Sequence, residues 1–201
     1  MRDEAMPAVD VVFGLAGTSL PSDHAEALAR AVAQWLPWLD DEPAAGIHPL
    51  RTAPTTQGVV LLARRARLLL RVPARRAEAA LALAGRRLDV GEGLATSGGE
   101  VRELMPSPTV YAGRVVSAAV DDRAFHDEIA GWLAASGVGC EFISGRPKPC
   151  TAGGTTTLAW GLALHGLAPA ESLRVQGEGC GPHRRLGCGL FVPHKAIAVS
   201  E

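Results

Sequence analysis

The chain is poor in aromatic residues, which make up 4% of its 201 residues, and it has no long run of apolar side chains. A membrane-spanning helix needs ~20 consecutive apolar residues, so no segment is expected to cross a bilayer. The first residues, Met1-Arg2-Asp3-Glu4, lack the order of charged and then apolar residues that marks a secretory signal peptide. We therefore expect a soluble, cytoplasmic protein whose core is built from Leu, Val and Ala.

Nucleotide-binding and metal-binding motifs are also missing. No Gly-Lys-Ser/Thr follows the glycine-rich segment near the C-terminus, as a Walker P-loop requires, and the strand–loop–helix order of a Rossmann fingerprint is absent. No two cysteines form a Cys-x-x-Cys pair, and a reducing cytoplasm disfavours disulfides. We expect no cofactor and no metal. Zinc bound by Cys180, Cys188 and His183 is an alternative that their spacing does not favour.

Near the C-terminus, within the segment 177–189, the Gly-x-Gly triplets 179–181 and 187–189 lie on either side of an arginine pair. Glycine permits φ > 0 and a close approach of the backbone, and arginine offers a planar charged fork to phosphate. The segment therefore predicts a cradle for a phosphodiester chain. Its expected contacts are Gly179, Gly181, His183, Arg184, Arg185, Gly187 and Gly189. The alternative is a wide hairpin whose glycines serve only the turn geometry.

Basic residues are concentrated in one region, although the formal net charge is only −1. Between positions 64 and 87 the single acid is Glu78, and the arginines are Arg64, Arg65, Arg67, Arg71, Arg75, Arg76, Arg86 and Arg87. As a cluster they favour a polyanion as partner, whereas each arginine alone is well explained as a solvated surface residue. Arg146 and Lys148, in a Pro/Gly segment, form a second basic loop.

The predicted elements occur in the same order in both halves of the chain. The first half contains a strand at 8–13, a helix from Asp23 to Pro37, strands at 58–63 and 67–72, a helix at 73–85 and a strand at 88–90. The second half contains a strand at 111–120, a helix capped by Asp121 or Asp122, strands at 138–143 and 156–165, a short helix from Pro169 and a strand near Leu190. The order β-α-β-β-α-β is that of the ferredoxin-like unit.

We therefore predict an α+β protein with two tandem ferredoxin-like, RRM-like domains. Residues 1–104 form the N-terminal domain, which carries the candidate catalytic histidine, and residues 105–201 form the C-terminal domain, which carries the glycine-rich loop. The Pro-containing segment 105–108 is a stiff linker between them. A single larger α+β domain is the alternative.

Two of the six histidines are candidates for catalysis. Metal-independent RNA cleavage needs a base for the 2′-hydroxyl proton and an acid for the leaving 5′-oxygen, and imidazole titrates near neutrality. His48 lies in a loop, where Pro49 restrains its backbone and Arg51 could offset phosphate charge. His24, in the first turn of the first predicted helix, is the second candidate. A structural role is the alternative for each.

The chain resembles the CRISPR repeat-processing endoribonucleases, in particular a short subtype named after myxobacteria. The resemblance covers nearly the whole sequence. Its motifs include Gly46-Ile47-His48-Pro49-Leu50, Leu104-Met105-Pro106-Ser107-Pro108 and Gly187-Cys188-Gly189-Leu190-Phe191-Val192-Pro193. The middle residue of each glycine triplet is usually aliphatic in this family, and here both are cysteine.

The resemblance implies metal-independent cleavage of CRISPR repeat RNA to 5′-hydroxyl and 2′,3′-cyclic phosphate ends. It also implies an enzyme that stays on its guide RNA and joins a larger interference complex in antiviral defence. A histidine in or just after the first helix is catalytic in related enzymes, which implies His48 or His24. Arg64, Arg65, Arg67, Arg146 and Lys148 would help to hold the RNA. The alternative is a non-catalytic RNA-binding subunit.

Overall fold

The computed structural model describes residues 7–55, 58–152 and 154–195, and the chain divides into two compact units. Unit 1 comprises Met1–Glu103 and Arg184–Gly187, and unit 2 comprises Leu104–His183 and Cys188–Glu201. Four residues of the glycine-rich segment therefore cluster with unit 1, although the sequence predicts the whole segment in the C-terminal domain. The division into domains 1–104 and 105–201 stays a prediction. No helix within the described residues is both long enough and apolar enough to cross a membrane.

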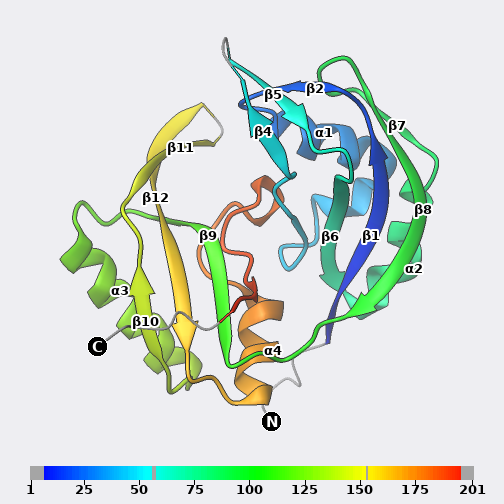
Figure 1. The fold of residues 1–201 in the computed structure, drawn as a ribbon. Coiled ribbons are helices and arrows are strands. Elements are labelled where there is room, and N and C mark those ends of the chain that lie inside the picture. Colours follow the sequence, from blue (N-terminus) through cyan, green and yellow to red (C-terminus); the bar gives the residue numbers. More distant parts are fainter. Residues whose placement is uncertain (1–6, 56–57, 153, 196–201) are drawn as a thin grey trace. The chain divides into compact units, whose positions relative to one another are not determined.

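Unit 1 is built on an antiparallel sheet in the order β3-β6-β1-β8-β7 (Figure 1). Its strands are β1 (Ala8–Ala16), β3 (Gly46–Ile47), β6 (Arg67–Pro73), β7 (Arg87–Leu88) and β8 (Leu94–Glu103). The first strand thus lies between the third and fourth principal strands, as in a ferredoxin-like unit. The helical segments are α1 (Ala25–Trp35), η1 (Pro37–Leu39), η2 (Ala74–Arg76), α2 (Ala77–Ala80) and η3 (Leu81–Leu83).

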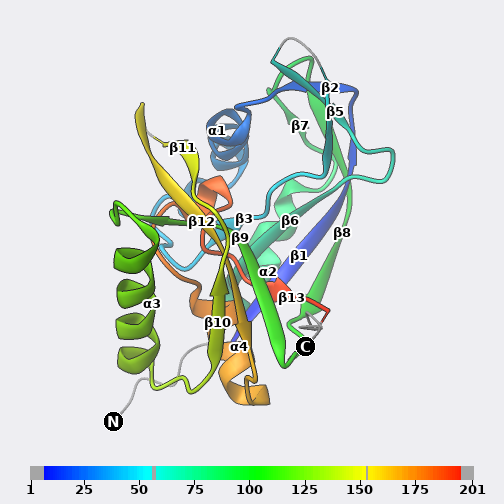
Figure 2. The same cartoon turned by 60° about the vertical axis from the view of Figure 1, so that its left-hand side comes forward.

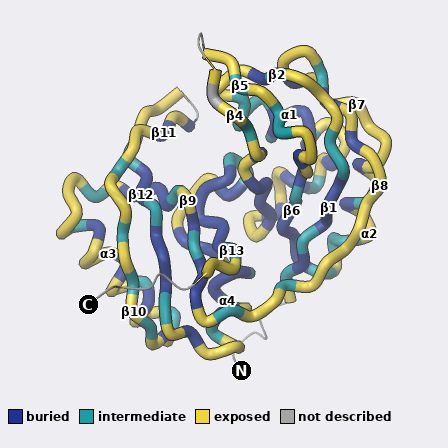
Figure 3. Tube along the Cα trace, in the orientation of Figure 1, coloured by how far each residue is buried: buried dark blue, intermediate teal, exposed yellow. Residues whose placement is uncertain are grey.

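Two strands of unit 1 differ from the sequence prediction. The predicted strand at 58–63 is β5 (Val59–Leu62), which belongs to a separate sheet with β2 (Ser19–Pro21) and β4 (Thr52–Pro54). The second principal strand is instead the two-residue β3. The fourth principal strand is β8 and not residues 88–90. Strand β8 is exposed along most of its length (Figure 3), so it lacks the alternation of buried and exposed residues that marks a strand.

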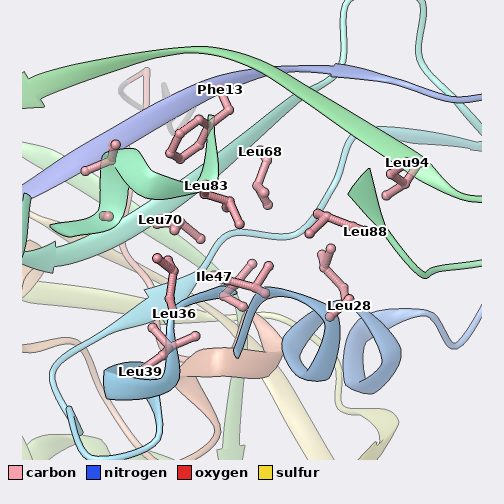
Figure 4. Packing of buried hydrophobic residues seen from close by; sticks show 14 of the residues in the cluster. Phe13, Leu28, Leu36, Leu39, Ile47, Leu68, Leu70, Leu83, Leu88 and Leu94 are labelled. Carbon is pink, nitrogen blue, oxygen red and sulfur yellow. The ribbon is translucent and has the colours of Figure 1, made fainter. Parts of the chain in front are cut away.

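The core of unit 1 forms where the buried residues of β1 and β6 meet the helical segments. Phe13, Leu68 and Leu70 lie with Leu83 and Leu36 in one apolar cluster (Figure 4). Alternate residues of a strand point to the same face, which explains the burial of Leu68 and Leu70. Burying each such side chain contributes ~1.5–3 kcal/mol relative to exposure.

Unit 2 has the same strand arrangement, in the order β10-β12-β9-β13, with β11 paired to β12. Its elements are β9 (Thr109–Ser117), α3 (Asp122–Ser136), β10 (Glu141–Ser144), β11 (Lys148–Ala152), β12 (Thr155–His165), α4 (Pro169–Glu178) and β13 (Val192–Pro193). The short turn η4 (Arg184–Leu186) belongs to unit 1.

Helix α3 lies against the unit 2 sheet (Figure 2) and begins as the sequence predicts. The Asp121 carboxylate accepts a hydrogen bond of 2.8 Å from the backbone N–H of Ala124, which satisfies a donor that the helix itself leaves unpaired. From this helix, Phe125 stacks on Trp160 of β12 with 4.5 Å between ring centroids. This packing fixes α3 on the core of unit 2.

Candidate functional site

His48 directly follows β3, and its side chain is buried inside unit 1. The residue is 7% exposed, and its backbone N–H donates to the Leu69 carbonyl at 2.9 Å. Its Nε2 lies 3.5 Å from Oδ1 of Asp10, at the limit of hydrogen-bonding distance. The ring therefore faces other side chains of unit 1 and is not presented to solvent.

Asp10 forms a two-point salt bridge with Arg71. The two residues lie opposite each other on β1 and β6. Arg71 donates from Nε to Oδ1 and from Nη2 to Oδ2, both at 2.9 Å. Burial alone would raise the pKa of Asp10, but the nearby His48 ring, the hydrogen bonds from Arg71 and the charge of Arg71 lower it to about 2. Asp10 is therefore ionised at neutral pH.

The same surroundings keep the His48 ring uncharged at neutral pH. Burial lowers the pKa of its imidazole; Asp10 opposes this effect, while the positive charges of Arg71 and Arg184 add to it. A buried, neutral ring next to a carboxylate suits a structural role. In this conformation His48 does not have the exposure that proton exchange with an RNA hydroxyl requires.

His24 differs from His48 in both exposure and hydrogen bonding. It is the N-cap residue of α1 and is only partly buried, whereas the sequence predicts Asp23 at the cap. Its Nδ1 lies 2.8 Å from the Pro21 carbonyl oxygen, which can only accept, so Nδ1 carries the proton. The lone pair of the neutral ring is then on Nε2.

The arginine cluster of the sequence does not form one surface. Arg71 is buried against Asp10, and Arg75 and Arg76 both pair with Glu42. The guanidinium of Arg86 lies over the Trp35 ring, 4.5 Å from its centroid. Arg87 is exposed, as are the candidate residues Arg51, Arg64, Arg65 and Arg67. Only part of the cluster is therefore available to a polyanion.

The four triplet glycines are required by the backbone geometry. Gly179, Gly181, Gly187 and Gly189 all have positive φ, from 66° to 80°. A Cβ on Gly189 would lie 2.0 Å from the Cys180 carbonyl oxygen. A Cβ on Gly187 would lie 2.8 Å from Cγ of Pro49, in the loop that carries His48. These positions exclude other residues because of conformation and space.

Five backbone donors of the glycine-rich segment bond to carbonyls of the protein, three of them within the segment itself. The N–H groups of Gly179, Cys180 and Gly189 donate to the carbonyls of Val175, Gly189 and Arg114. Those of Gly187 and Cys188 donate to the carbonyls of Arg184 and His183. These five groups are engaged within the protein, so they do not form an open amide cradle for phosphate. The turn interpretation accounts for the glycines.

Between the triplets, Arg184 and Arg185 contact residues of unit 1. Arg184 is 8% exposed and donates from Nη2 to the Ala44 carbonyl at 3.0 Å. Arg185 pairs with Asp40. His183 is exposed and is the only non-glycine residue in the described part of the chain with positive φ, at 65°. Of the three, His183 is the side chain most open to a ligand.

In unit 2, Arg146 and Lys148 are exposed, with Arg146 just before β11 and Lys148 at its start. All four cysteines are free thiols. No group of three His, Cys, Asp or Glu side chains suited to a metal ion occurs among the residues that the structure describes.

Comparison with known proteins identifies the family. The family model described as Cas6 Crispr matches residues 9–196. This chain belongs to the Cas6 family. A CRISPR-associated endonuclease Cas6 of Myxococcus xanthus (strain DK1622) is 33% identical over 190 residues, covering 94% of this chain and 82% of the relative.

Solved structures agree with the fold. One named CRISPR associated protein Cas6 has a TM-score of 0.68 at 11% identity and covers 94% of this chain and 100% of its own. Thermus thermophilus Cse3, bound to an RNA representing a pre-cleavage complex, has a TM-score of 0.53 at 14% identity, covering 92% of this chain and 98% of its own. The predicted α+β class with tandem ferredoxin-like domains is confirmed, as is the resemblance drawn from the sequence.

The sequence analysis of this Cas6 protein missed Asp10 and treated Arg71 as a surface residue. Both stand alone within apolar strands, Asp10 in Val9–Phe13 and Arg71 in Leu68–Val72. Single charges of opposite sign in two buried strands are a signal for a buried ion pair. That signal was available without coordinates.

Proposed function

We propose that this protein is a metal-independent endoribonuclease that cleaves CRISPR repeat RNA in a precursor transcript. It leaves a 5′-hydroxyl and a 2′,3′-cyclic phosphate, acts in the cytoplasm and stays on its guide RNA, with which it joins a multi-protein interference complex. Family membership and the 33% identical endonuclease support RNA processing. The free Nε2 of His24 is the observation that supports the assignment of its base.

In this mechanism His24 and not His48 takes the proton of the 2′-hydroxyl. The Pro21 carbonyl accepts a hydrogen bond from the Nδ1–H of His24, so Nε2 is the nitrogen that can accept the hydroxyl proton. His24 also has the partial exposure that His48 lacks. The 2′-oxygen then attacks phosphorus and forms the cyclic phosphate, and the 5′-oxygen leaves and takes a proton from solvent. A positioned base of this kind contributes ~10²–10⁴-fold to the rate.

His48 instead supports the loop that follows β3. Its ring next to Asp10 and its N–H on the Leu69 carbonyl hold residues 46–49 against β6. RNA is held by exposed cations, and we propose Arg51, Arg64, Arg65, Arg67, Arg146 and Lys148 for this role. Arg184, Arg185 and the triplet glycines shape the protein and do not contact phosphate directly. We also propose His183 as an RNA contact because its side chain is exposed.

The test compares single histidine variants on repeat RNA in the presence of EDTA. We expect His24→Ala to lose cleavage by ~10²-fold or more and His48→Ala to cleave in proportion to its folded fraction. His126→Ala, which removes an exposed histidine of α3, is the matched control and should cleave like the unchanged protein. Full cleavage by His24→Ala would reject the assignment.

End-group analysis separates the mechanism from the function. A 2′,3′-cyclic phosphate on the upstream product is expected, and a 3′-hydroxyl would contradict attack by the 2′-oxygen. Tight binding of repeat RNA with no cleavage, unchanged in both histidine variants, would identify the non-catalytic RNA-binding subunit instead.

A further inference from the structure

Two buried cysteines of unit 2 lie next to each other. Sγ of Cys150, on β11, is 4.0 Å from Sγ of Cys188, in the second glycine triplet. With Val116 and Ala159 they form a small apolar cluster apart from the main core of the unit. Both thiols are free.

We propose that Cys150 and Cys188 form a reversible disulfide that ties β11 to the glycine-rich segment when a disulfide oxidant such as glutathione disulfide is present. The Cys150 thiolate attacks one sulfur of the oxidant, which gives a mixed disulfide and releases one glutathione thiolate. The Cys188 thiolate then attacks Sγ of Cys150 and releases the second. Two protein thiols are oxidised, and one glutathione disulfide is reduced to two thiols.

The thiols are protected while β11 is in place. Cys150 is 7% exposed and Cys188 is fully buried, and burial raises the pKa of Cys188 to about 12. A thiol is a poor nucleophile, so the closed form reacts slowly. Oxidation therefore needs a local opening of the protein.

Strand β11 can open because it lies at the edge of the sheet. Within the described residues it pairs only with β12, through Lys148–Ala152. Detachment of this strand exposes Cys150 to the oxidant and removes the cover that Cys150 gives to Cys188. While β11 is still detached, the uncovered Cys188 attacks the mixed disulfide on Cys150, and the strand then closes on β12 with the bond in place.

Locking β11 has a consequence for the basic residues before it. Lys148 begins the strand two positions before Cys150, and Arg146 lies just ahead of it. The disulfide would hold these exposed cations in the closed arrangement. The inference rests on the sulfur geometry and does not depend on RNA cleavage.

The experiment treats the reduced full-length protein with glutathione disulfide and measures its intact mass. We expect the loss of the mass of two hydrogen atoms, reversed by dithiothreitol. Digestion with trypsin and endoproteinase Glu-C cuts after Glu141, Arg174 and Arg184, so each cysteine falls in a separate peptide. The expected cross-link joins the peptides of Cys150 and Cys188.

Variants show which cysteines form the disulfide and whether the result depends on a disturbed fold. Cys188→Ser should stop at a glutathione adduct on Cys150. The double variant Cys140→Ser/Cys180→Ser keeps the proposed pair and should oxidise like the unchanged protein. Hydrogen exchange of the β11 amides should slow in the oxidised form. Glutathione adducts without a cross-link in the double variant, or a link to Cys140 or Cys180 in the unchanged protein, would overturn the proposal.

Discussion

Removing the carboxylate of Asp10 is the most direct test of how unit 1 is held together. Asp10→Ala leaves the guanidinium of Arg71, which is 1% exposed, without its bidentate partner. Breaking a buried ion pair from one side costs ~3–5 kcal/mol. The pKa of about 2, against an ordinary 3.8, implies a preference for the ionised form of roughly 2 kcal/mol in the folded state.

Native-state hydrogen exchange measures this loss in each unit separately. Amides of β6 should exchange ~150-fold faster or more, because each 1.36 kcal/mol corresponds to a factor of ten, while amides of β9 should not change. Replacing both partners, in Asp10→Leu/Arg71→Met, should recover much of the lost stability because neither charge of the pair is then left buried without its partner.

The exposed pair of Arg102 and Glu100 provides the control. Its two side chains are 45% and 62% exposed, so Arg102→Ala should not change exchange in β6 measurably. If Asp10→Ala leaves β6 exchange as slow as in the unchanged protein, the reasoning about the buried pair is refuted.

Two further predictions concern the conformation of Gly189 and the stability of unit 1 at low pH. Gly189→Ala places a Cβ 2.0 Å from the Cys180 carbonyl oxygen at a φ of +66° and should lower Tm by ~4–8 °C, a loss of ~2 kcal/mol, in calorimetry. Gly139→Ala, with open space around its Cβ, should change Tm little; equal effects would contradict the clash. In exchange measurements, unit 1 should weaken first below pH 6.5, where the unfolded chain protonates His48 and the folded one does not. It should weaken again from pH 3.8 towards 2 as Asp10 protonates, and His48→Gln should abolish only the first step.

Long, regular elements could be predicted from the sequence because local signals specify them. The helix after Asp121 and the strand Thr155–His165 lie close to their predicted positions. The two-residue β3 is too short to show any period, and the apolar run Val59–Leu62 was assigned in its place. Strand β8 is specified by backbone pairing with β1, which leaves little trace in its side chains.

The candidate site was only partly accessible from sequence. Both histidines could be selected by residue type, but their exposure depends on residues distant in the chain. Asp10 and Arg71 fix the surroundings of His48, and no spacing rule connects the three. The glycines could be read as a phosphate cradle because the sequence does not show that carbonyls such as those of Arg114 and Val175 already accept their N–H groups.

The inclusion of Arg184–Gly187 in unit 1 bears on how the protein is made. During synthesis the ribosome releases Met1–Glu103 long before these four residues emerge. Until then the Ala44 carbonyl lacks its guanidinium donor, and the surface around Pro49 lacks Gly187. The N-terminal unit can thus reach its final form only after Arg184–Gly187 has been synthesised. A transcript truncated after Glu103 would encode a unit that is incomplete, whatever the stability of its sheet.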